Sequence, residues 1–128
     1  MDSSAASVES VRLDPELSRA LGEARRYLGS VLIVTGSVRA RPDRIDQALA
    51  LSLEHVRRSR QEPGCLFHSV HHDAEDPLRL VFLEQWVDAD ALRAHFRVPA
   101  SGSFVNEVAA LAASPPEMAI YDAQPASL

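Results

Sequence analysis

Apolar residues recur along the chain with two different periods, and the alternation between them predicts a series of strands and helices. Short runs rich in β-branched and aromatic residues predict strands at 31–39, 65–72, 78–87 and 117–121. Apolar positions three and four residues apart predict helices at 42–60, 88–97 and 101–113. Pro99 is expected to end the helix that precedes it.

The segment Asp73–Pro77 consists of turn-forming residues and lies between two predicted strands, so it predicts a hairpin of antiparallel neighbours. The complete order is then β-α-β-β-α-β. This order predicts an α+β, ferredoxin-like fold, in which helices cover one face of a four-stranded antiparallel sheet.

The second strand of the hairpin is apolar on both faces. One face contains Leu80, Phe82 and Trp86, and the other contains Val81, Leu83 and Val87. Helices on one side of the sheet leave the second apolar face uncovered. A second copy of the sheet is the simplest cover, so we expect a homodimer related by a two-fold axis.

Three regions follow from this pattern. Residues 1–30 are expected to form a polar tail and an added amphipathic helix at 14–28, which Asp14 and Pro15 would begin and Gly29 would end. Residues 31–122 form the predicted domain, and 123–128 form a C-terminal tail.

Charge and composition narrow the class of protein. Acidic residues outnumber basic ones 18 to 13, which argues against nucleic acid as a partner. Every basic residue is arginine, so lysine chemistry is excluded. A lone cysteine, Cys65, forms no internal disulfide, and no apolar run is long enough to span a membrane. The N-terminus lacks the pattern of a secretory signal, so we expect a cytoplasmic protein.

Glu84, Trp86 and Phe82 alternate along one strand and therefore share a face. Trp86 is either an anchor of the core or dimer interface or a wall of a pocket for an aromatic substrate. Glu84 is either held by an arginine, such as Arg79 or Arg39, or acts as a proton acceptor whose pKa is raised by burial.

His95 borders the apolar face of its predicted helix. It is either a structural histidine or a general base that removes the proton of a hydroxylated ring. His68 is a further candidate for a pocket, because its strand face is otherwise apolar.

Strand geometry argues against a metal site built from His68, His71 and His72. The last two point to opposite faces, and His68 and His72 lie about 13 Å apart. A site that combines His71 and Asp73 with residues from elsewhere stays a minor alternative. The glycines are scattered and form no phosphate or dinucleotide loop, so we expect no metal and no organic cofactor.

Three segments together carry a family resemblance: Glu62-Pro63-Gly64-Cys65, then Glu84-Gln85-Trp86, and finally 88–95, Asp-Ala-Asp-Ala-Leu-Arg-Ala-His. With these motifs, residues 31–122 resemble the antibiotic biosynthesis monooxygenase family. The resemblance implies a dimeric α+β barrel. It also implies one of several activities, among them cofactor-free oxidation of polycyclic phenols by dioxygen and the degradation of haem.

The resemblance carries Trp86 and His95 over as pocket candidates. The haem-degrading branch has an asparagine and a histidine where this chain has Gly36 and, near the second position, Val108. Valine cannot ligate iron, so haem degradation is the weakest of the implied activities.

The leading hypothesis is a cofactor-independent monooxygenase that acts on a quinol or polyphenolic aromatic. His95 and Glu84 would be catalytic, and Trp86, Phe82 and His68 would bind the substrate. The alternative is a non-catalytic dimeric barrel that binds a small apolar ligand or acts as an interaction module.

Overall fold

The computed structural model describes residues 14–16 and 30–128. The predicted helix at 14–28 therefore lies almost wholly outside the described residues. Four strands form one antiparallel sheet in the order β2-β3-β1-β4. They are β1 (Val31–Arg39), β2 (Cys65–Asp73), β3 (Asp76–Trp86) and β4 (Glu117–Ala123).

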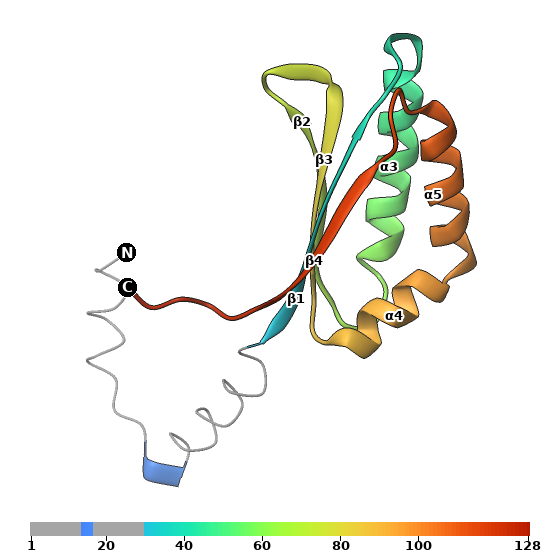
Figure 1. Ribbon diagram of the computed structural model, residues 1–128. Coiled ribbons are helices and arrows are strands. Elements are labelled where there is room, and N and C mark those ends of the chain that lie inside the picture. Colours follow the sequence, from blue (N-terminus) through green and yellow to red (C-terminus); the bar gives the residue numbers. More distant parts are fainter. Residues whose placement is uncertain (1–13, 17–29) are drawn as a thin grey trace.

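Helices lie on one side of this sheet (Figure 1). A short 3-10 turn, η1 (Pro42–Arg44), leads into α3 (Ile45–Ser59), and α4 (Ala89–Arg97) and α5 (Pro99–Leu111) follow β3. The α+β ferredoxin-like order expected from the sequence is confirmed. The second crossover contains two helices, and Pro99 begins α5 as well as ending α4, because proline suits the first helical position.

The strand register decides which side chains face the helices. Glu84 of β3 pairs with His68 of β2 on one side and with Val34 of β1 on the other, and Val34 in turn pairs with Ile120 of β4. Directly paired residues share a face, and side chains alternate along each strand. The even-numbered residues of β3 therefore point towards the helices.

The odd-numbered residues of β3 point to the helix-free face, and this corrects one expectation. Arg39 pairs with Asp76 at 2.9 Å, and Arg79 pairs with Asp73 at 3.1 Å, so both arginines stabilise the hairpin end of the sheet. Neither can reach Glu84, which lies on the opposite face of the sheet.

Two apolar clusters form the core between sheet and helices. The larger contains Val38, Ala40, Ala48, Leu80, Val108 and Leu111, and the smaller contains Val34, Trp86 and Leu92. Along β3, Glu84 lies between Leu80 of the first cluster and Trp86 of the second. A polar centre is thus inserted into an otherwise apolar layer.

Gly64 makes the turn into β2 possible. Its φ is +81°, and a Cβ at this position would lie 2.5 Å from the Cβ of Ala91 and 2.9 Å from Cγ1 of Val87. Glycine is required here both for the left-handed backbone and for the close approach of α4.

We expect Gly64→Ala to lower the free energy of unfolding by about 2–4 kcal/mol, because it adds backbone strain and a clash. Urea denaturation measures this change. The matched control is Gly102→Ala, since Gly102 lies in α5 with open space around it. That helical replacement should raise stability by about 0.5–1 kcal/mol. A neutral Gly64→Ala would contradict the assigned turn.

Candidate active site

A cavity of about 360 Å³ lies between the helix-facing side of the sheet and the helices. Most of its wall is apolar, with Val34, Phe82, Phe104, Val105, Val108 and Met118 among the lining residues. Its titratable groups include His55, Glu84 and His95. An apolar cavity with a few convergent polar groups is the usual form of a small-molecule site.

His95 enters the cavity from α4. The side chain of Asp88 caps this helix by accepting a hydrogen bond of 2.8 Å from the backbone N–H of Ala91, as the sequence predicts. His95 is buried on the inner face of the helix, and its Nδ1 lies 2.7 Å from Oε1 of Glu62. A carboxylate only accepts, so Nδ1 donates and the lone pair of the imidazole is on Nε2.

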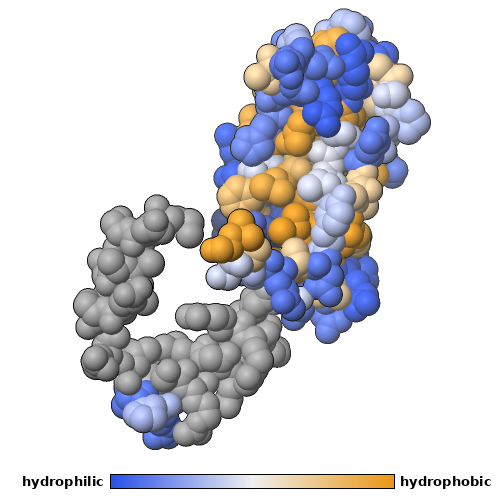
Figure 2. All heavy atoms as spheres, turned by 60° about the vertical axis from the view of Figure 1, so that its left-hand side comes forward, coloured by the Kyte–Doolittle hydropathy of each residue, from blue (hydrophilic) through white to orange (hydrophobic). Residues whose placement is uncertain are grey.

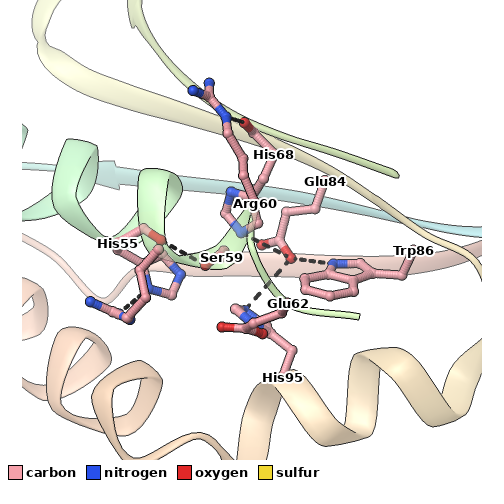
Figure 3. A network of polar contacts seen from close by, with 9 residues as sticks. His55, Ser59, Arg60, Glu62, His68, Glu84, Trp86 and His95 are labelled. Atoms are coloured by element: carbon pink, nitrogen blue, oxygen red, sulfur yellow. Dashed lines mark hydrogen bonds and ion pairs between the residues drawn. The ribbon is translucent and has the colours of Figure 1, made fainter. Parts of the chain in front are cut away.

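Glu84 is buried at the centre of the site (Figure 3). The indole Nε1–H of Trp86 donates to its Oε1 over 2.8 Å, and Nε2 of His68 and of His95 lie 3.4 Å and 4.0 Å from the same oxygen. Side chains from β3, β2 and α4 thus converge on one carboxylate.

The pKa of Glu84 is shifted downwards, whereas from the sequence we expected burial to raise it. Burial by itself raises this pKa, but the close contact with His68 and the hydrogen bond from the Trp86 N–H outweigh burial and hold it below its ordinary value. Glu84 is therefore a stable carboxylate. Such a group is better suited to stabilise a neighbouring positive charge than to accept a proton itself.

Trp86 is fully buried and lies beside His95, with ring centroids 4.6 Å apart. It is not among the lining residues of the cavity, and neither is the fully buried His68. Both lie behind Glu84 and His95. Phe82, His95 and Glu84, by contrast, face the cavity.

His55 is a site residue that sequence reasoning missed. It comes from the buried face of α3, and its ring stacks on Phe104 with centroids 4.0 Å apart. Arg58, one turn later, donates from its guanidinium to Nδ1 of His55 over 2.9 Å. Helical spacing could have identified His55, because it lies on the same face of α3 as the buried Ala48 and Ser52.

Burial, together with smaller effects of the neighbouring His68, His95 and Arg58, lowers the pKa of His55 from its ordinary 6.5 to about 3. His55 is therefore a neutral imidazole at physiological pH. Glu62 is the second residue that was missed, since in the sequence it marks only the end of a helix.

The histidine cluster, formed by His55, His68 and His95, is the only group in the described part of the chain with the spacing of a metal site. One ring nitrogen of each lies within 4.8 Å of the others. The hydrogen bond from Arg58 limits this possibility. Because Nδ1 of His55 accepts, its Nε2 must hold the proton and has no lone pair for an ion. Ligation by all three rings would require Arg58 to release His55.

Fold and site together define an α+β ferredoxin-like domain with a histidine-lined apolar cavity. The family model for antibiotic biosynthesis monooxygenase matches residues 31–107. This chain therefore belongs to the antibiotic biosynthesis monooxygenase family, and the resemblance seen in the sequence is confirmed.

Two kinds of relative support the assignment. An uncharacterized protein of Synechocystis sp. is 33% identical over 104 residues, which span 81% of this chain and 71% of that protein. A crystal structure described as an antibiotic biosynthesis monooxygenase is 33% identical, with a TM-score of 0.69, and covers 73% of this chain and 99% of its own.

A structure described as a putative antibiotic biosynthesis monooxygenase from Deinococcus radiodurans shares the fold. Its TM-score is 0.72 at 23% identity, and the match covers 76% of this chain and 96% of that chain. Within the described residues, no helix has both the length and the apolar character needed to cross a membrane.

The low pKa of His55 predicts a pH dependence of stability. Between pH 6.5 and about 3 the unfolded chain binds a proton at His55 that the native protein does not, so stability falls as pH decreases. We expect the free energy of unfolding in urea to decline from pH 7.5 to 4.5, and less steeply in His55→Phe. His72→Phe, at an exposed position, should keep the wild-type slope. Parallel slopes for wild type and His55→Phe would refute a depressed pKa.

Proposed function

We propose that this family member catalyses cofactor-independent monooxygenation of a quinol or polyphenolic aromatic substrate in the cavity beneath α4 and α5. The observation that carries the proposal is the Glu62–His95 pair. Its carboxylate fixes Nδ1 of His95 as a donor and leaves Nε2 as a proton acceptor in an apolar cavity.

Cofactor-free oxygenation requires an electron-rich anion, because the substrate itself must supply the electron that reduces dioxygen. His95 is proposed to generate this anion by removing the proton of a ring hydroxyl. The imidazolium that results lies between two carboxylates, Glu62 at 2.7 Å from Nδ1 and Glu84 at 4.0 Å from Nε2. Both favour the charged ring, as the buried aspartate does in a catalytic triad.

The cavity suits a flat apolar molecule. A volume of about 360 Å³ falls in the range of ordinary small-molecule sites, and the aromatic residues Phe82 and Phe104 line it. Exclusion of water strengthens the electrostatic interactions within such a site and protects the anion from protonation.

We expect His95→Asn to lower kcat for a quinol substrate by about 10²–10⁴-fold, because general-base catalysis contributes this much. Glu62→Gln keeps a hydrogen-bond acceptor but removes the charge, so it should lower kcat less than His95→Asn does. Oxygen uptake against a panel of quinols is the measurement.

His72→Asn is the matched control, since His72 is an exposed histidine that does not line the cavity. Equal oxygen uptake by all variants would remove His95 and Glu62 from the mechanism. Ligand binding without any oxygen uptake by the wild type would favour the alternative, a non-catalytic barrel that binds small apolar molecules.

We also propose a homodimer formed through the helix-free face of the sheet. With the left-hand side of Figure 1 turned forward, Figure 2 shows a band of hydrophobic side chains bordered by hydrophilic ones. The register puts Ile33, Val81, Leu83, Phe67 and Tyr121 on this face. Phe67 and Tyr121 are 43% and 54% exposed, an unusual state for aromatic residues on a sheet face.

Sedimentation velocity at micromolar concentration should show a species of twice the chain mass. Leu83→Asp should give a folded monomer, because it places a charge in the proposed interface without touching the core. Ala74→Asp, in the exposed hairpin turn, should stay dimeric. A wild-type monomer at these concentrations would contradict the proposal.

A further inference from the structure

The imidazoles of His55 and His95 hold their protons on different ring nitrogens. The hydrogen-bond partner of each ring determines which nitrogen is protonated. A guanidinium has no acceptor, so the 2.9 Å contact from Arg58 requires Nδ1 of His55 to accept. Neutral His55 must then have its proton on Nε2. A carboxylate has no donor, so the 2.7 Å contact from Glu62 requires the reverse arrangement in His95.

These two rings lie beside each other and line the same cavity. Their centroids are 5.3 Å apart, and one ring nitrogen of each lies within 4.8 Å of the other. An oxygen atom that makes hydrogen bonds of about 2.8 Å can bridge two nitrogens up to roughly 5.6 Å apart. A ligand oxygen between those two nitrogens is within hydrogen-bond reach of both rings. Because Nδ1 of each ring is hydrogen-bonded to Arg58 or Glu62, the Nε2 atoms are the ones left to meet the ligand.

We propose that His55 donates a hydrogen bond from Nε2–H to the phenolate oxygen that forms when His95 removes its proton. The inference rests on the proposed base role of His95. In this step the O–H bond of the ligand breaks, the proton moves to Nε2 of His95, and the electron pair stays on the oxygen. His55 then stabilises that negative oxygen without itself gaining or losing a proton.

The surroundings of His55 suit a fixed donor. Stacking on Phe104 at an interplanar angle of 5° holds the plane of the ring, and Arg58 places a positive charge behind it. Arg58 is itself anchored by a hydrogen bond of 3.2 Å to the carbonyl of Ala100. A donor that is oriented before the reaction and shielded from water stabilises developing charge more than a mobile one does. Arg58 is thus a positioning residue.

The same histidine cluster suggests a different occupant, a divalent metal ion, and the two assignments make opposite demands on His55. A metal ligand needs an unprotonated nitrogen that faces the ion, whereas the donor role needs a proton there. The hydrogen bond from Arg58 to Nδ1 of His55 favours the donor.

The first test is the tautomer of each histidine, read from ¹⁵N chemical shifts of the imidazole rings in the full-length protein. We expect the Nε2–H form for His55 and the Nδ1–H form for His95. Arg58→Met removes the donor to Nδ1, so the His55 signals should shift towards a mixture of tautomers while those of His95 stay unchanged. An Nδ1–H form of wild-type His55 would overturn the proposal.

The second test uses 4-nitrophenol, whose anion absorbs visible light, and 4-nitroanisole, which has no proton to lose. We expect the wild type to lower the apparent pKa of bound nitrophenol. His55→Phe, which preserves the stacking on Phe104, should weaken binding of the anion about tenfold or more and leave nitroanisole affinity unchanged. His72→Phe is the control and should match the wild type for both ligands.

If His55→Phe lost affinity for nitrophenol and nitroanisole equally, His55 would have a packing role only, and the proposal would be overturned. Binding of Zn²⁺ that is lost in His55→Phe would overturn it too, since ligation needs the proton-free nitrogen. Phenolate binding through His55 in a protein that consumes no oxygen would support this inference while refuting the monooxygenase function. The two proposals can therefore fail separately.

Discussion

A carboxylate on the interior face of a sheet is the constraint on which this structure depends. Glu84 lies in the middle strand pair, between two apolar clusters, and burial of an unpaired carboxylate there would cost several kcal/mol. Trp86 donates to it from the same strand, and His68 approaches it from β2. Nε2 of His95 lies 4.0 Å from the same oxygen, so one buried charge gathers side chains from β3, β2 and α4 at one point.

The alternation of side chains along strands accounts for how much of the site could be predicted. Once β3 was recognised, Phe82, Glu84 and Trp86 had to share a face, and the hairpin register pairs His68 of β2 with Glu84 on that face. The spacing of apolar positions in α4 likewise put His95 beside the buried Leu92. These residues follow from local rules of two- and four-residue periodicity.

The parts that could not be predicted depend on contacts between elements. Glu62 is 33 positions from His95 in the chain, and only the left-handed turn at Gly64 folds its loop against α4. Nothing in local spacing indicates that pairing. The pKa of Glu84 was misjudged for a related reason: burial was visible in the strand pattern, but the contact with His68 that opposes burial most strongly crosses from the neighbouring strand.

Hydrogen bonding at Nδ1 gives His55 and His95 different chemistry, although both are histidines that line the same cavity. Both rings are buried and line the same cavity. What separates them is the partner behind each ring, a guanidinium behind His55 and a carboxylate behind His95. Protonation of His95 is offset by the charge of Glu62, whereas protonation of His55 would add a second positive charge beside Arg58. His95 thus offers a proton acceptor at Nε2, and the neighbouring His55 offers a donor there. Reversing these two roles would require Glu62 and Arg58 to change places.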